Sequence, residues 1–160
     1  MRILIVSDSH GNNKYLVETL QRVNNIDLMI HLGDYGGSEE YVKSIAPCPI
    51  EMIAGNNDQY KGLPYDKVIQ IGDYKVYLTH GHRYGVYFGT RSIKKAAKTR
   101  QADIVMFGHT HVPVIDMKDS VWAINPGSIS LPRQRERIPT FMIMDIDNNG
   151  EAHFTLNYCK

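Results

Sequence analysis

The N-terminal part of the chain repeats one pattern, a short aliphatic run that is followed at once by a polar turn. The aliphatic runs, residues 1–6, 28–32 and 50–53, are expected to be buried strands. Leu16, Leu20 and Val23 recur at helical spacing after the first run, and Ser38 precedes a second helix that begins with two glutamates. Strands and helices in this order form a βαβαβ unit, which predicts a parallel sheet.

The C-terminal part of the chain combines further strand patterns with one amphipathic helix. We expect paired strands at residues 67–72 and 74–79, a helix at 90–100 and a buried strand at 104–107. Four strands are expected to follow, at residues 112–117, 121–124, 140–146 and 152–157, the last two joined by the hairpin sequence Asn148-Asn149-Gly150. The predicted fold class is α/β, with two mixed β-sheets packed into a sandwich core and flanked by helices, in a single domain over residues 1–160.

Length and charge limit the class of protein and its partners. A chain of 160 residues buries about 69% of its extended surface on folding, so it can form a core without disulfides. Lys and Arg total 18 against 17 Asp and Glu, so no global field attracts nucleic acid or a membrane surface. No apolar run approaches the ~20 residues of a membrane span. Two isolated cysteines and the absence of a signal-like segment predict a cytoplasmic location, and homo-oligomerisation stays open.

The helix expected at residues 90–100 carries a basic face. No aromatic residues interleave with its charges, so we interpret the face as solvent-exposed rather than as a nucleic-acid site. The basic residues are Arg91, Lys94, Lys95, Lys98 and Arg100.

Polar side chains that can bind metals follow five of the expected strands, at the point where each strand ends. In an open α/β sheet these carboxyl ends line the ligand crevice. Burying so many polar groups there is unfavourable unless something pairs with them. The candidate metal ligands are Asp8, His10, Asp34, Asn56, His80, His109 and His111.

Two pairs of these ligands stand two residues apart, Asp8 with His10 and His109 with His111. On an extended backbone such residues point to the same face. Each pair is therefore expected to reach one ion or two neighbouring ions.

The ligand types indicate the kind of ion. Carboxylate, imidazole and amide oxygen without thiolate suit Mn²⁺, Ni²⁺, Fe²⁺ or Zn²⁺, of which Mn²⁺ is our first choice. Seven ligands are too many for one tetrahedral ion but suit two divalent ions, with the lone carboxylate Asp34 as the expected bridge. Two such ions and two aspartates leave a pocket of roughly +2 charge, which attracts a phosphate ester.

Five short blocks in this order resemble the motifs of the calcineurin-like metallophosphoesterase superfamily. The chain is most similar to the small, minimal phosphodiesterase branch of that superfamily, over nearly its whole length, and residues 125–128 also resemble a segment of that branch. The blocks are Asp8-Ser9-His10, Gly33-Asp34, Gly55-Asn56-Asn57-Asp58, His80-Gly81-His82 and Gly108-His109-Thr110-His111.

The resemblance implies a division of the ligands between two ions and a reaction. A small phosphoester, foremost a phosphodiester, would be hydrolysed by a metal-bridging hydroxide that attacks phosphorus in line. Asp8, His10, Asp34 and His111 would hold the first ion, and Asp34, Asn56, His80 and His109 the second.

One position departs from the family pattern. Many members carry a histidine directly after the asparagine of the third block, where it can protonate the leaving oxygen, but this chain has Asn57. An amide cannot supply that proton, although it can donate a hydrogen bond, so we predict modest activity that is better on good leaving groups. Asn57 and His82 are the candidate catalytic and substrate-binding residues, with a plain surface role as the alternative for His82.

Several other residues lie near these blocks in the sequence and could support the site or extend it. His31 is expected to be a core or supporting histidine, and Asp58 to orient ligands or cap a turn. Tyr84, Tyr87 and Phe88 could wall the pocket or form a dimer contact. Arg133, Arg135 and Arg137 could touch the substrate phosphate, although a solvated loop is the expectation.

Two other functions compete with the two-metal hydrolase. The first is a non-catalytic interaction scaffold with the same fold, because the retromer scaffold subunit is similar to this branch. A complete set of ligand types argues against it. The second is serine hydrolysis by Ser9 with His10, which fails because adjacent residues on an extended chain point to opposite faces.

Overall fold

The first of two five-stranded sheets is built around the N-terminal strand. In the computed structural model, which describes residues 1–58 and 62–159, this sheet has the strand order β10-β9-β1-β2-β3. The strands β1, β2 and β3 pair in parallel, as the predicted βαβαβ unit requires, and β9 and β10 add an antiparallel hairpin. The bounds are β1 Arg2–Val6, β2 Leu28–His31, β3 Ile50–Met52, β9 Thr140–Ile146 and β10 Ala152–Tyr158.

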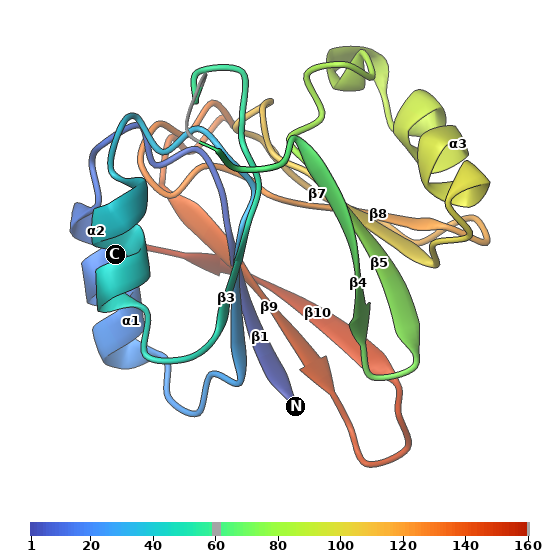
Figure 1. Cartoon of the computed structure of the whole chain (residues 1–160), viewed down its shortest axis with the longest axis horizontal. Coiled ribbons are helices and arrows are strands. Elements are labelled where there is room, and N and C mark those ends of the chain that lie inside the picture. The colour runs from blue at the N-terminus through green and yellow to red at the C-terminus, as the bar shows by residue number, and fades with distance from the viewer. Residues whose placement is uncertain (59–61, 160) are drawn as a thin grey trace.

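The second sheet is also mixed and faces the first (Figure 1). Its order is β4-β5-β6-β8-β7, with β5, β6 and β8 parallel and the two edge strands antiparallel to their neighbours. The α/β fold with two packed mixed sheets is therefore confirmed. The bounds are β4 Asp66–Ile71, β5 Tyr74–Thr79, β6 Ile104–Met106, β7 Pro113–Asp116 and β8 Trp122–Pro126.

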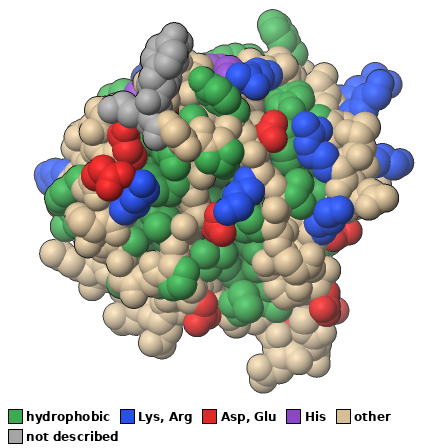
Figure 2. Space-filling model, viewed as in Figure 1, with side chains coloured by type: hydrophobic (Ala, Val, Ile, Leu, Met, Phe, Trp, Pro, Cys, Tyr) green, Lys and Arg blue, Asp and Glu red, His purple; other side chains and the backbone are tan. Residues whose placement is uncertain are grey.

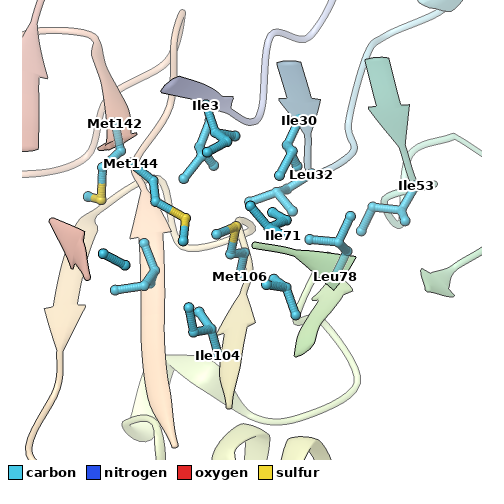
Figure 3. Close-up of a cluster of buried hydrophobic side chains, with 14 residues drawn as sticks. Ile3, Ile30, Leu32, Ile53, Ile71, Leu78, Ile104, Met106, Met142 and Met144 are labelled. Carbon is cyan, nitrogen blue, oxygen red and sulfur yellow. The ribbon is translucent and has the colours of Figure 1, made fainter. Parts of the chain in front are cut away.

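An apolar core fills the space between the two sheets. Ile3 of β1 faces Leu78 of β5 and Met106 of β6 across it (Figure 3). Ile5 of β1 belongs to the same cluster, and all four side chains are fully buried. The alternate residues of β1, among them Leu4, lie in a second cluster beneath the helices. Since β1 is covered on both faces, a continuous aliphatic run is the sequence that it needs.

Helices cover the outer face of each sheet (Figure 1). Helices α1 (Lys14–Arg22) and α2 (Glu39–Ile45) contribute Leu16 and Val42 to the cluster on the first sheet. Helix α3 (Arg91–Thr99) packs through Ile93 and Ala97 on the second sheet, and a short 3₁₀ turn, η1 (Val86–Phe88), precedes it. Within the described residues, no helix is both long and apolar enough to traverse a bilayer.

The basic face of α3 differs from the prediction at Lys94. Its side chain is only 8% exposed, and its ammonium group lies 2.9 Å from Asp116 and 2.8 Å from Asp119. The expectation that every lysine of this face is solvated was therefore wrong at this residue. Lys94 ties α3 to the end of β7, because a nearly buried cation needs carboxylate partners.

Candidate metal centre

The seven predicted ligands lie on loops at one end of the two sheets. Asp8 and His10 follow β1, Asp34 follows β2, and Asn56 lies beyond β3 in the first sheet. The second sheet supplies three histidines, His80 after β5 and the pair His109 and His111 after β6. The carboxyl ends of parallel strands from both sheets thus meet at one place, as expected for a ligand site of an α/β protein.

Two aspartates stand at the centre of this cluster. Asp8 Oδ1 is 3.2 Å from His111 Nε2 and 3.8 Å from His80 Nε2, and Asp34 Oδ2 is 3.4 Å from the same His80 atom. His10 Nε2 lies 3.9 Å from Asp8 Oδ1 and 3.7 Å from Asp34 Oδ2. Potential ligand atoms of Asp8, His10 and His111, and likewise of Asp8, Asp34 and His80, all fall within 4.8 Å of one another. Both carboxylates therefore stand where they could be shared, with Asp8 common to the two groups.

Of the two remaining predicted ligands, His109 lies against this centre. The ring of His109 is 5.2 Å from that of His80, and its backbone N–H donates to Asp8 Oδ2. The Asn56 side-chain oxygen is buried and has no hydrogen-bond partner.

Backbone carbonyls fix the orientation of two histidines. His80 Nδ1 lies 2.7 Å from the Leu32 carbonyl oxygen, and His111 Nδ1 lies 2.6 Å from that of Leu131. A carbonyl oxygen only accepts, so each Nδ1 carries a hydrogen and donates. This leaves Nε2, the nitrogen on the side of the aspartates, as the one that could bind a metal, the arrangement that a metal-binding histidine requires.

Three of the predicted ligands have a buried polar atom without a hydrogen-bond partner: Asp8 Oδ1, Asn56 Oδ1 and His80 Nε2. Such groups are unfavourable in a folded protein without a partner. All three atoms have lone pairs, so a bound cation could replace the missing donors. The residues present therefore fit divalent metal ions.

Charge coupling among the ligands appears in their pKa values. Burial opposes the charged form of Asp34, but the nearby protonated form of His80, whose Nε2 lies 3.4 Å away, and the hydrogen bonds from Asn57 outweigh it and hold the pKa of Asp34 well below its usual range. For His80, burial is likewise outweighed, by Asp34 and Asp8, and its pKa is raised. The two carboxylates thus stay ionised and attract positive charge.

The backbone at the ligands is left-handed, not extended. Asp8, His10, Asp34, His109 and His111 have φ values of 56°, 46°, 59°, 68° and 59°. The prediction that extended backbone aligns each pair of ligands was therefore wrong in its geometry, although both members of each pair do reach the site. Non-glycine residues seldom adopt this conformation, and its clustering at five ligands is typical of a functional site whose surroundings hold it in place.

A family model described as a calcineurin-like phosphoesterase superfamily domain matches residues 1–149. The chain belongs to this superfamily. It is 34% identical over 151 residues to the probable metallophosphoesterase YsnB of Bacillus subtilis, covering 94% of this chain and 87% of the relative. It is 30% identical over 174 residues to the phosphodiesterase MJ0936 of Methanocaldococcus jannaschii, covering 98% and 99%.

A solved structure shares the fold at lower identity. Vps29 of Entamoeba histolytica in complex with zinc superposes with a TM-score of 0.76 at 21% identity and full coverage of both chains. At this identity the likeness establishes the fold alone. Membership of the superfamily makes the chain a hydrolase that acts on phosphoester bonds and implies divalent metal ions as its cofactors.

Residues beneath the ligands hold the loops of this phosphoesterase together. The Asp58 carboxylate accepts hydrogen bonds from the backbone N–H groups of Asp34, Tyr35 and Gly55 and so joins the loops after β2 and β3. Asp58 therefore has the orienting role that the sequence indicated. Gly108 lies so close to Ser7 that an added Cβ would be 2.0 Å from its hydroxyl oxygen, which explains a glycine there.

The segment at residues 125–128 supports the same loops. Ser128 and Ser130 both donate to the Asp8 carbonyl oxygen, and Asn125 donates to that of Gly108. The resemblance pointed to this segment without indicating a role for it. The contacts of Ser128 and Ser130 with Asp8 reach the first sheet from the second, and no local spacing rule could have indicated them.

The two predicted substrate residues lie at the centre but face different groups. Asn57 donates to the Asp34 carboxylate through its backbone N–H at 2.9 Å and through its side-chain amide at 2.7 Å. The ring of His82 lies 5.6 Å from His80 and 6.1 Å from His109. Burial and the neighbouring cations lower the pKa of His82 to about 4.

His31 and Ser9 pair with each other below the site. The Gly33 N–H donates to His31 Nδ1, so Nε2 of the neutral ring carries the hydrogen and donates to Ser9 Oγ at 3.1 Å. This agrees with a core or supporting role for His31. It also gives the Ser9 hydroxyl a partner other than His10.

Among the aromatic residues near the site, Tyr87 reaches the ligands. Its hydroxyl donates to the His109 carbonyl oxygen, and its ring lies 5.1 Å from the His109 ring. Tyr84 instead pairs with Tyr77, and Phe88 is 97% exposed.

Proposed function

We propose that this chain is a phosphodiesterase that uses two divalent ions at one site. The proposed ligands are those predicted from the sequence, with both aspartates placed where they can be shared. The substrate is a small phosphoester. Mn²⁺ is the preferred ion because the donors are carboxylate, imidazole and amide oxygen. The ligands are Asp8, His10, Asp34, Asn56, His80, His109 and His111.

The observation that supports this proposal most directly is the set of buried atoms without partners. Asp8 Oδ1, Asn56 Oδ1 and His80 Nε2 follow three different strands, and potential ligand atoms of Asp8 and His80 lie within 4.8 Å of one another. A protein that used these residues only for structure would satisfy them with donors of its own.

The protein's own residues position and charge the site. Carbonyl oxygens fix the rings of His80 and His111, and Asn57 holds the Asp34 carboxylate. When bound, divalent ions neutralise phosphate oxygens and lower the pKa of water toward neutrality. Fixed donors in a water-excluded site need little reorganisation during the reaction.

Asn57 and His82 are proposed to contact the substrate. The Asn57 amide donates to Asp34 and can also turn a hydrogen toward an ester oxygen, but it has no proton to transfer. His82, with a pKa of about 4, is neutral at pH 7 and can donate one hydrogen bond to phosphate. Without a general acid at position 57, esters with good leaving groups should react best.

A metal-reconstitution assay tests the proposal. The protein is chelated, Mn²⁺, Ni²⁺, Zn²⁺ or Mg²⁺ is restored separately, and nitrophenol release is followed from bis(4-nitrophenyl) phosphate and 4-nitrophenyl phosphate. We expect the metal-restored protein to hydrolyse the diester and the His111→Gln variant to lose this activity. His153→Gln is the matched control, because His153 pairs with Asp147 on the exposed β9–β10 hairpin.

Elemental analysis of the same samples separates the alternatives. Activity on the monoester alone would contradict the diesterase assignment. Inactivity with every metal, despite two bound ions per chain, would favour the interaction scaffold.

The proposed cytoplasmic location is supported by the two cysteines, which are both free thiols.

A further inference from the structure

A chain of hydrogen bonds leads from the metal centre to an exposed arginine. Arg133 donates from its guanidinium to the Tyr87 hydroxyl at 2.9 Å, and that hydroxyl donates to the His109 carbonyl oxygen at 3.1 Å. The Arg133 backbone N–H also donates to the His111 carbonyl oxygen at 3.0 Å. Both ends of Arg133 are therefore tied to the loop that carries two of the proposed ligands.

The partner of this guanidinium is neutral. Arg2, Arg100 and Lys94 each lie within 4.0 Å of an aspartate, whereas Arg133 has no carboxylate partner anywhere in residues 1–58 and 62–159. Among the described residues, then, no carboxylate compensates the charge of Arg133, and its guanidinium is held by Tyr87. An arginine held in this way loses little conformational freedom when it binds an anion.

The guanidinium lies at the rim of the site rather than among the ligand atoms. The Tyr87 ring packs edge-on against His109 at 5.1 Å, and Arg133 binds the outer end of that ring. The side chains of Tyr87 and Arg133 are both exposed. Figure 2 shows one face of the molecule, on which blue Lys and Arg side chains lie scattered among apolar ones. At the proposed centre the scissile phosphate would be neutralised by two ions, so a guanidinium at the rim suits a different group of the same substrate.

We infer that Arg133, positioned by Tyr87, binds a second anionic group of the substrate. The preferred substrates are then phosphodiesters that carry a further phosphate. This inference rests on the proposed function, because it needs the scissile diester at the metal centre. Arginine matches phosphate through two parallel hydrogen bonds, which a solvated lysine would not provide with the same geometry.

Two pairs of probes that differ by one phosphate test the inference. The substrates are the 4-nitrophenyl ester of thymidine 5′-phosphate and the same compound with a 3′-phosphate. The second pair, thymidine 5′-phosphate and thymidine 3′,5′-diphosphate, are the products that these substrates would give, and their Kd is measured by calorimetry on the Mn²⁺-loaded protein. We expect the added phosphate to lower KM and Kd by about fivefold to tenfold, which lies between the effect of an exposed ion pair and that of a shielded charge-assisted hydrogen bond.

Variants assign this preference to Arg133. The measured quantity is the ratio of KM, or of Kd, without the added phosphate to that with it. Arg133→Gln should reduce this ratio to about one. Tyr87→Phe, which keeps the ring, should reduce it by roughly half, because the guanidinium loses its fixed partner. Arg135→Gln is the matched control from the same exposed loop and should keep the wild-type ratio.

The outcomes separate this inference from the proposed function. If Arg133→Gln weakens both members of each pair equally, Arg133 contacts the scissile phosphate and the inference is wrong. A wild-type ratio near one, or a ratio that Arg133→Gln leaves intact, also overturns it. Absence of nitrophenol release together with an Arg133-dependent Kd ratio would instead contradict the proposed hydrolysis and leave the anion site standing.

Discussion

At the scale of single residues, Asn57 is the position where this chain departs from the family pattern that it resembles. A histidine there could protonate the leaving oxygen, whereas the amide of Asn57 donates to the Asp34 carboxylate. The same contact helps to lower the pKa of Asp34. Asn57 therefore stabilises a charged ligand at the expense of acid catalysis.

We expect Asn57→His to raise kcat on diesters with poor leaving groups. General acid catalysis contributes ~10²–10⁴-fold in favourable cases, and an unoptimised histidine should supply about tenfold. The measurement compares kcat for phenyl and 4-nitrophenyl diesters, because only the phenolate of higher pKa needs the proton. Asn57→Gln keeps the amide without an acid and serves as the control. An unchanged rate on the phenyl ester, with two ions still bound, would refute this role of position 57.

At the scale of elements, the strands and their polar ends could be predicted from the sequence, but the conformation of the ends could not. Aliphatic runs such as that of β1 identify buried strands because burial on both faces allows no polar alternation. The left-handed φ of Asp8 and His109 has no local sequence rule, since residues other than glycine reach it only when tertiary contacts impose it. The carboxylate partners of Lys94 likewise come from a distant loop.

Gly108 joins β6 to the ligand loop, and we expect Gly108→Ala to weaken metal binding. Its Cβ would meet Ser7 Oγ at 2.0 Å and Asp8 Oδ2 at 2.7 Å, so the loops after β1 and β6 must separate. Overpacking of this kind destabilises a fold by about 1–3 kcal/mol. Bound metal per chain and urea unfolding measure the two effects.

Two further variants test the cause of this effect. Ser7→Ala combined with Gly108→Ala removes the closer contact and should restore part of the metal binding. Gly37→Ala is the control, because Gly37 has a φ of +82° but open space around it, so it introduces strain without a clash. Equal loss of metal in Gly37→Ala would mean that general destabilisation, not the contact with Asp8, is responsible.

At the scale of the whole molecule, the proposed ligands divide between the two sheets. The loops of the first sheet carry His10 and all the proposed oxygen donors, Asp8, Asp34 and Asn56, whereas His80 and the pair after β6 come from the second sheet. Bound ions would therefore cross-link the sheets at the end where the apolar core between them stops.

This arrangement predicts a large stabilisation of the chelated protein when Mn²⁺ is restored. A ligand at 100 times its Kd stabilises the folded state by about 2.7 kcal/mol per site. For a chain of this length 1 kcal/mol corresponds to roughly 2–4 °C, so two filled sites should raise Tm by at least about 10 °C. His111→Gln should lose much of this rise, and His153→Gln, outside the site, should keep it.

Acid should reduce the same stabilisation, because histidine ligands bind metal only when neutral. Hydrogen bonding and charge from Asp34 and Asp8 raise the pKa of His80, so the metal-free fold holds a proton on this ring above the pH at which a free histidine would release it. Protons then compete with Mn²⁺, and the rise in Tm should shrink as pH falls from 8 toward 5.

Hydrogen exchange should show slower opening on Mn²⁺ binding in the loops after β1 and β6 together. Protection confined to one sheet would mean that the ions do not bridge the two layers.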